Sequence, residues 1–176
     1  LIEDLIQFSH AARGDLSIHP KPFSINKIFK ISVSHISNIV RENHLEITYS
    51  VPEQLPEVFA DEEKIRWVLM QLLDNAVKFT PEGGRISVSA ENDNGAVSIS
   101  VADTGIGIAK ESIPEIFEPF HQLDGSITRQ YAGTGLGLTM AHRIMDAHGS
   151  SLNVESSVGE GTQFKFTLPI ADDKYD

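Results

Sequence analysis

Polar side chains line one face of a strongly patterned segment, residues 62–79. Gln71, Asn75 and Lys78 recur at intervals of four and three residues, so they share one face if the segment is helical. Two amide oxygens one turn apart could help to hold a hard cation such as Mg²⁺, which prefers oxygen ligands. Lys78 could meet an anion beside it. The alternative is an ordinary solvated helix face. Taken by itself, the polar stripe favours this alternative over a binding site.

Two glycine-bearing segments could bind a small molecule. One follows a predicted strand and has the sequence DTGIG over residues 103–107, where glycines let the backbone approach a ligand closely. The other opens a predicted helix and has the sequence GTGLGL over residues 133–138. Free N–H groups and the helix dipole favour a phosphate at such a position. This second segment matches neither a P-loop nor a dinucleotide fingerprint. The alternative to a binding role is a plain turn for residues 103–107 and a flexible hinge for residues 133–138.

Composition excludes several classes of chemistry. The chain has 176 residues, of which 14 are Lys or Arg and 25 are Asp or Glu, so its net charge is −11. This negative charge argues against non-specific binding to nucleic acid or to an anionic membrane. The absence of cysteine excludes disulfides, thiolate catalysis and Cys-ligated metal sites. No apolar run approaches the roughly 20 residues that span a bilayer. Because the first residue is Leu1, we expect a cytoplasmic fragment of a longer protein that could itself be membrane-anchored.

Apolar spacing predicts the elements that must position these side chains. The predicted helices cover about residues 25–42, 62–79, 110–117 and 136–147. The predicted strands cover about residues 45–51, 58–60, 85–91, 96–102, 150–156 and 162–169, with a short edge strand within 16–23. Helices followed by strand pairs predict an α+β fold, with helices on one face of a mixed sheet.

Five motifs in a fixed order resemble the ATP-binding catalytic domain of sensor histidine kinases. That family lies within the superfamily of gyrase, Hsp90-type chaperone, histidine kinase and MutL ATPases. The resemblance covers about residues 16–170 and rests on LLDNAVKFT at 72–80, DTGIGI at 103–108, IFEPF at 116–120, GTGLGL at 133–138 and GEGTQF at 159–164.

The resemblance implies a domain division and a fold. Residues 1–15 would be the C-terminal remnant of a dimerisation and phosphoacceptor helix, residues 16–171 the ATP-binding catalytic domain, and residues 172–176 a polar tail. The fold would be a two-layer α/β sandwich, a mixed sheet of about five strands packed under three main helices. Residues 120–135 would form a mobile ATP lid, anchored by Phe117 and Phe120.

Roles for individual residues follow from the same resemblance. Asn75 would coordinate Mg²⁺ on the ATP phosphates, with Gln71 as a second candidate metal ligand. Lys78 would contact phosphate, and Phe79 would line the nucleotide side of its helix. Asp103 would accept a hydrogen bond from the exocyclic amine of adenine, and since guanine has a carbonyl there, ATP would be preferred over GTP.

Further residues would complete the nucleotide site. Arg129 in the lid would reach the γ-phosphate, and Thr162 would lie behind Asp103. Gly105 and Gly107 would shape the adenine pocket, and Gly135 and Gly137 would place helix amides near the phosphates. The remaining candidate nucleotide contacts are Ile108, Phe120, Gly133, Thr134, Leu136 and Leu138.

One departure from the superfamily concerns the reaction. ATPases of the superfamily have a water-activating Glu four residues before the metal Asn, where this chain has Gln71. An amide cannot take a proton at neutral pH, which argues against ATP hydrolysis by that route. None of the seven histidines is followed by an acidic residue, as the phosphoacceptor of the family usually is.

We therefore expect a protein-histidine kinase domain whose phosphoacceptor lies outside this chain. The fragment would be a monomer and its parent a homodimer, with the dimerisation helices and a response regulator receiver domain as partners. Neither nucleic acid nor a membrane would contact the fragment directly. The alternatives are a degenerate nucleotide-binding signalling scaffold without kinase activity and a superfamily ATPase.

Overall fold

Twelve elements make up the computed structural model, which describes residues 16–121 and 134–171. The helices are α2 (Ile25–Glu42), α3 (Glu62–Phe79) and α4 (Gly137–Ala147), with two 3₁₀ turns, η1 (Lys110–Ser112) and η2 (Glu115–Phe117). The strands are β1 (Lys21–Phe23), β2 (Glu46–Ser50), β3 (Val58–Ala60), β4 (Arg85–Asp93), β5 (Ala96–Asp103), β6 (Asn153–Ser157) and β7 (Gly161–Pro169).

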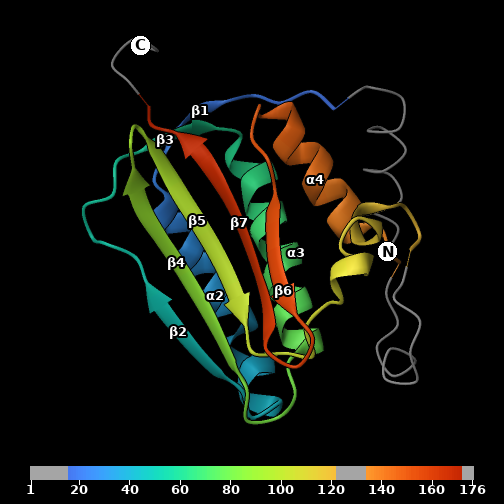
Figure 1. Cartoon of the computed structure of the whole chain (residues 1–176). Coiled ribbons are helices and arrows are strands. Elements are labelled where there is room, and N and C mark those ends of the chain that lie inside the picture. Colours follow the sequence, from blue (N-terminus) through green and yellow to red (C-terminus); the bar gives the residue numbers. More distant parts are fainter. Residues whose placement is uncertain (1–15, 122–133, 172–176) are drawn as a thin grey trace.

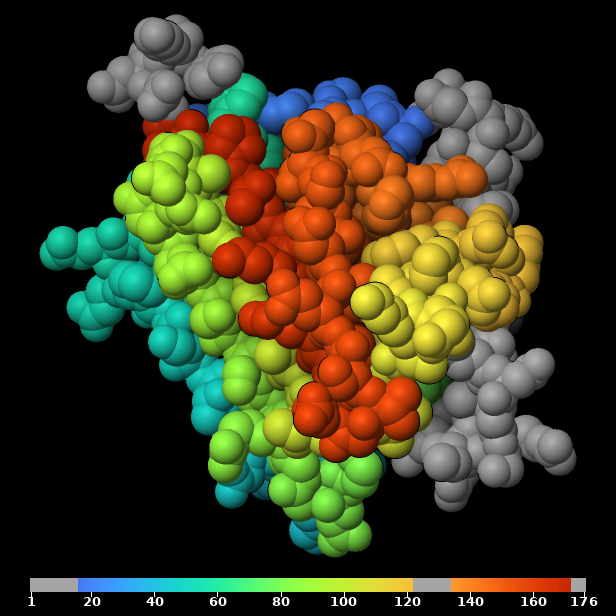
Figure 2. Space-filling model, viewed as in Figure 1, coloured from blue at the N-terminus to red at the C-terminus, as the bar shows by residue number. Residues whose placement is uncertain are grey.

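The helices lie on one side of a five-stranded sheet (Figure 1). The strand order is β2-β4-β5-β7-β6, with β2 parallel to β4 and the other pairs antiparallel. A separate two-stranded sheet pairs β1 with β3. Figure 2 shows the strands at the surface on the opposite side, because α2 and α3 lie behind them. The predicted α+β class and mixed five-stranded sheet are confirmed.

Local signals define the two long helices. α2 and α3 have the predicted bounds, and the side chain of Asp61 caps α3 by accepting a hydrogen bond from the N–H of Lys64. The core-facing residues of α3 are Ile65, Val68, Leu69, Leu72, Leu73 and Ala76. They meet the apolar inner face of the sheet, which is formed chiefly by Ile86, Val88, Ile99, Val101, Phe164, Phe166 and Leu168.

Three predicted elements differ from the structure by more than one residue at an end or in their type. The single helix predicted over 110–117 is wrong, because η1 and η2 are separate turns on either side of Pro114, which has no N–H to donate. β4 extends two residues further than predicted, to Asp93, so the turn to β5 consists only of Asn94 and Gly95, both with positive φ. β6 begins at Asn153, three residues later than predicted.

No helix in the described residues is long and apolar enough to cross a membrane.

Candidate nucleotide-binding site

The inner face of the sheet changes from apolar to polar at one end. Val101, Phe164 and Val154 stand opposite one another across β5, β7 and β6. Two positions closer to this end of the sheet, the same face carries Asp103 on β5, Thr162 on β7 and Ser156 on β6. These three residues are again in register. The sheet thus presents a row of three polar side chains toward the helix layer.

Asp103 is held by the backbone around it. Its Oδ1 accepts a hydrogen bond of 2.8 Å from the N–H of Gly105, and the backbone of Thr162 also hydrogen-bonds the carboxyl. Burial raises the pKa of Asp103, and these two hydrogen bonds oppose the rise. An ionised carboxylate has about four lone-pair sites, so acceptor capacity remains for a ligand.

The loop after Asp103 packs tightly against α3 and the β6–β7 turn. The N–H of Ile106 donates to the carbonyl oxygen of Phe79, the last residue of α3, at 3.1 Å. A Cβ on Gly105 would lie 2.5 Å from the same oxygen. Gly107 has a φ of +69°, and a Cβ there would lie 1.9 Å from the carbonyl oxygen of Ser157. Both predicted glycine positions are therefore sites of close backbone approach.

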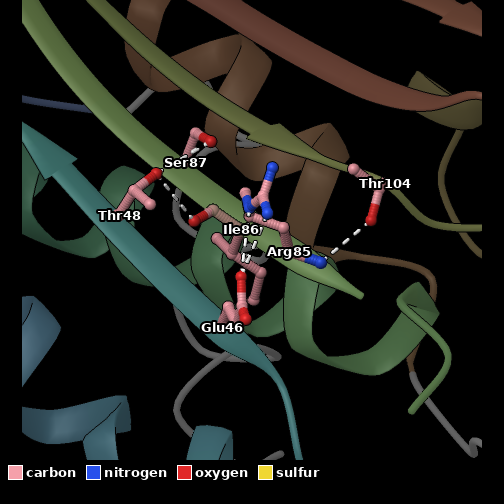
Figure 3. Close-up of polar contacts among 6 residues, drawn as sticks. All are labelled: Glu46, Thr48, Arg85, Ile86, Ser87 and Thr104. Carbon is pink, nitrogen blue, oxygen red and sulfur yellow. Dashed lines mark hydrogen bonds and ion pairs between the residues drawn. The ribbon is translucent and has the colours of Figure 1, made fainter. Parts of the chain in front are cut away.

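Thr104 attaches the start of this loop to β4 (Figure 3). The N–H of Arg85 donates to Thr104 Oγ1 at 2.9 Å, and the N–H of Thr104 donates to the carbonyl oxygen of Arg85 at 3.0 Å. The Arg85 guanidinium in turn pairs with Glu46 of β2 at 3.1 Å. These contacts fix the end of β5 at which Asp103 lies.

The polar stripe of α3 lies next to the start of α4. Gln71, Asn75 and Lys78 are all partly buried. A Cβ on Gly137 would lie 2.3 Å from Gln71 Oε1, so the two helices approach closely there. Lys78 Nζ stands 5.0 Å from the ring centroid of Phe79, and burial lowers the pKa of Lys78.

The N-terminus of α4 offers backbone donors. No side chain of the described residues caps this helix, and its first intrahelical hydrogen bond runs from Met140 N to Leu136 O. The N–H groups of residues 137–139, which include the partly buried Leu138, therefore have no intrahelical acceptor. The side chain of Leu136 is fully buried, and its N–H donates to Thr134 Oγ1, so Leu136 supports the helix start.

One hydrogen bond closes the base of the predicted lid. The N–H of Phe120 donates to the carbonyl oxygen of Gly135 at 3.1 Å, and Phe120 as a whole residue is 63% exposed. Gly135 has a φ of +69°, and a Cβ there would lie 2.9 Å from Phe120 C. Arg129, Gly133 and the predicted lid mobility lie outside the described residues.

Sequence reasoning missed Ser156. Its Oγ accepts a hydrogen bond of 2.8 Å from the N–H of Ile108 and lies 2.9 Å from Thr162 Oγ1. It thus connects two of the predicted nucleotide contacts. No signal in the sequence distinguishes this serine from Ser157 beside it, because only the register of β6 on β7 brings Ser156 opposite Thr162.

Comparison with known proteins identifies the family to which the chain belongs. The family described as "Histidine kinase-, DNA gyrase B-, and HSP90-like ATPase" matches residues 60–172. The chain belongs to this family. Its match includes α3, the loop after β5, α4 and β7, the elements that carry the predicted site.

Similar proteins narrow the assignment within the family. The chain is 36% identical over 171 residues to the adaptive-response sensory kinase SasA of Crocosphaera subtropica, covering 97% of the chain and 44% of SasA. It is 33% identical over 178 residues to the sensor histidine kinase WalK of Bacillus subtilis, covering 100% of the chain and 29% of WalK. The structure of full-length ShkA in complex with AMPPNP matches with a TM-score of 0.85 and 32% identity, over 97% of the chain and 35% of ShkA.

The chain thus spans less than half the length of each of these three proteins. It is an ATP-binding domain of the sensor histidine kinase type, as its motifs predicted. The roles of individual residues, which no comparison tests, stay predictions.

Proposed function

We propose that this domain binds ATP with Mg²⁺ and, within a longer protein, donates the γ-phosphoryl group to a histidine on dimerisation helices outside this chain. The observation that carries the proposal is the approach of Gly137 to Gln71. It brings the uncapped N-terminus of α4 beside the helix that carries Asn75 and Lys78. Phosphate-binding donors and a candidate metal ligand then lie on adjacent helices.

Asp103 would select the base. Its carboxylate accepts a hydrogen bond from the exocyclic amine of adenine and repels the carbonyl that guanine carries at that position. Gly105 and Gly107 let the loop after Asp103 pack closely against α3 and the β6–β7 turn, and this packing would shape the adenine pocket. The partly buried Ile108 and Phe79 would contact its apolar surface. Together these residues favour ATP over GTP.

The phosphates would lie between α3 and α4. The free N–H groups at the start of α4 and the ammonium of Lys78 stabilise negative charge there. The amide oxygen of Asn75 fits a hard cation such as Mg²⁺, which when bound neutralises charge on the phosphate oxygens. Gln71 is a weaker candidate ligand, because its Oε1 lies against Gly137 at the positive end of α4.

Gln71 also bears on what happens to the γ-phosphoryl group. Since an amide cannot accept a proton from water at neutral pH, this position does not activate a hydrolytic nucleophile. Phosphoryl transfer then depends on positioning and charge neutralisation. The acceptor would be a histidine of the partner helices, and the phosphohistidine would pass its phosphoryl group to a response regulator receiver domain. Homodimerisation of the longer protein would bring donor and acceptor together, while this chain alone would be monomeric.

Phosphotransfer to added dimerisation helices tests the proposal. The chain is incubated with Mg²⁺ and γ-labelled ATP, with and without the dimerisation helices of its own longer protein. We expect acid-labile label on the helices, and none when Asn75→Ala replaces the wild-type chain. ATP binding without labelling would support the degenerate scaffold instead, and steady ADP release without the helices would support an ATPase.

A further inference from the structure

Ser156 makes three hydrogen-bond contacts through a single oxygen atom. Its Oγ lies 2.8 Å from the N atom of Ile108, 2.8 Å from the carbonyl oxygen of Gly161 and 2.9 Å from Thr162 Oγ1. It therefore joins the end of the Asp103 loop to the first two residues of β7. The exposed neighbour Ser157 lies on the opposite face of β6.

Counting hydrogens fixes the direction of these bonds. The N–H of Ile108 can only donate, and the carbonyl oxygen of Gly161 can only accept. The one hydroxyl hydrogen of Ser156 therefore goes to Gly161, since otherwise two oxygens would face each other at 2.8 Å without a hydrogen. The remaining bond is then donated by Thr162 to Ser156. The one hydrogen and both lone pairs of the Ser156 hydroxyl are thereby used.

Thr162 is consequently left with only lone pairs to offer elsewhere. It is 8% exposed, and it stands directly opposite Asp103 on the same face of the sheet. With its hydrogen committed to Ser156, its Oγ1 is an acceptor toward the site, as the Asp103 carboxylate is. Two neighbouring acceptors favour a ligand group that donates hydrogen bonds and repel a carbonyl.

We propose that Ser156 is a positioning residue that sets base specificity by holding the Thr162 hydroxyl as an acceptor. This inference rests on the proposed binding of ATP at Asp103. The group accepted is the amine of adenine, and the group rejected is the carbonyl that hypoxanthine and guanine carry in its place. Loss of the Ser156 hydroxyl frees the Thr162 hydroxyl to rotate and to donate to such a carbonyl.

The ratio of affinities for ATP and inosine triphosphate tests the specificity role. Ser156→Ala is expected to weaken ATP binding about three- to tenfold, as loss of one hydrogen bond does, and to weaken inosine triphosphate less or not at all. The affinity for ATP divided by the affinity for inosine triphosphate should therefore fall. Ser156→Thr keeps the hydroxyl and should restore the wild-type ratio, and Ser157→Ala is the matched control that should leave it unchanged. In a Thr162→Val background, Ser156→Ala should no longer alter the ratio.

An equal loss of affinity for both nucleotides in Ser156→Ala would overturn the proposal, because a loosened loop acts on both alike. An unchanged ATP affinity would also overturn it.

A ligand-free measurement separates this proposal from the proposed function. Amide hydrogen exchange at Ile108 should be at least about tenfold faster in Ser156→Ala than in wild type and unchanged in Ser157→Ala, because the hydroxyl of Ser156 accepts from that N–H. Unchanged protection of Ile108 in Ser156→Ala contradicts the hydrogen-bond assignment even if ATP binds. Failure of the wild-type chain to bind ATP, with exchange at Ile108 altered as expected, would overturn the base-selection role and the proposed function together.

Discussion

The imidazole Nε2 of His148 accepts a hydrogen bond from the backbone N–H of Asp61 across 3.0 Å, and so joins the end of α4 to the start of α3. The other ring nitrogen, Nδ1, lies 2.7 Å from the carbonyl oxygen of Ile144. Since a carbonyl can only accept, the ring hydrogen must be on Nδ1. One side chain thereby fixes the relative position of the two helices that carry the proposed phosphate contacts.

Replacing His148 should destabilise the fold. His148→Ala leaves the N–H of Asp61, a residue that is 7% exposed, without its acceptor. We expect a loss of about 1–3 kcal/mol in the free energy of unfolding, measured by urea denaturation. His35→Ala, at an exposed position of α2, is the control and should change it by less than about 0.5 kcal/mol. Equal stabilities of the two variants would show that the His148 contact contributes nothing.

The burial of Asp103 predicts a specific pH dependence of stability. A raised pKa in the folded state means that the stabilising contribution of Asp103 is fully present below its ordinary value of 3.8 and is lost as the pH rises through the raised value. Asp103→Asn removes this titration. At pH 7 the variant should therefore melt at a higher temperature than wild type, and the difference should shrink as the pH falls toward 3.8.

Thermal melts of both proteins across that pH range provide the measurement. A variant less stable than wild type at pH 7 would contradict the assignment of burial as the dominant influence on Asp103.

Two glycines with positive φ allow a test of close packing around the loop. Gly107 and Gly159 both have left-handed backbones, but only at Gly107 would a Cβ meet a neighbouring backbone oxygen. Gly159→Ala should cost about 1–2 kcal/mol for the backbone conformation alone. Gly107→Ala should cost about a further 1–3 kcal/mol from overpacking and should also weaken nucleotide binding. Comparable unfolding free energies for the two variants would contradict the close approach at Gly107.

Metal dependence distinguishes the two candidate ligands on α3. Asn75→Ala should weaken ATP binding in Mg²⁺ by about tenfold or more, because a contact to a charged group is lost. Its ATP affinity should no longer differ between Mg²⁺ and EDTA. Gln71→Ala should retain most of that difference, since Gln71 Oε1 lies against Gly137. Titrations in both buffers measure this, and full Mg²⁺ dependence in Asn75→Ala would exclude Asn75 as the ligand.

Local sequence patterns predicted much of the fold. The bounds of α2 and α3 follow from apolar periodicity and, for α3, from the Asp61 cap, all of which lie within one segment. The helix predicted at 110–117 is wrong because Pro114 has no N–H to donate and divides the segment into two short turns, although the apolar spacing there is helical. The start of β6 was misplaced because strand ends depend on a partner, here Lys165 of β7 opposite Asn153.

The residues of the candidate site likewise fall into those that a local motif predicts and those that depend on contacts distant in sequence. Asn75, Asp103 and Gly137 belong to compact motifs whose types and spacing suffice to select them. Ser156 and His148 act through contacts with residues 48 and 87 positions away, respectively. Such contacts exist only once the sheet register and helix packing are formed, so no pattern in the sequence indicates them.

Calorimetric titration of the purified chain with ATP and Mg²⁺, with GTP as the control, tests the central claim most directly. We expect saturable binding of ATP and none of GTP. Asp103→Asn should lose ATP affinity by about tenfold or more, as removal of a charged hydrogen-bond acceptor does. Absence of binding for both nucleotides, or equal binding of both by the wild-type chain, would contradict an adenine site at Asp103.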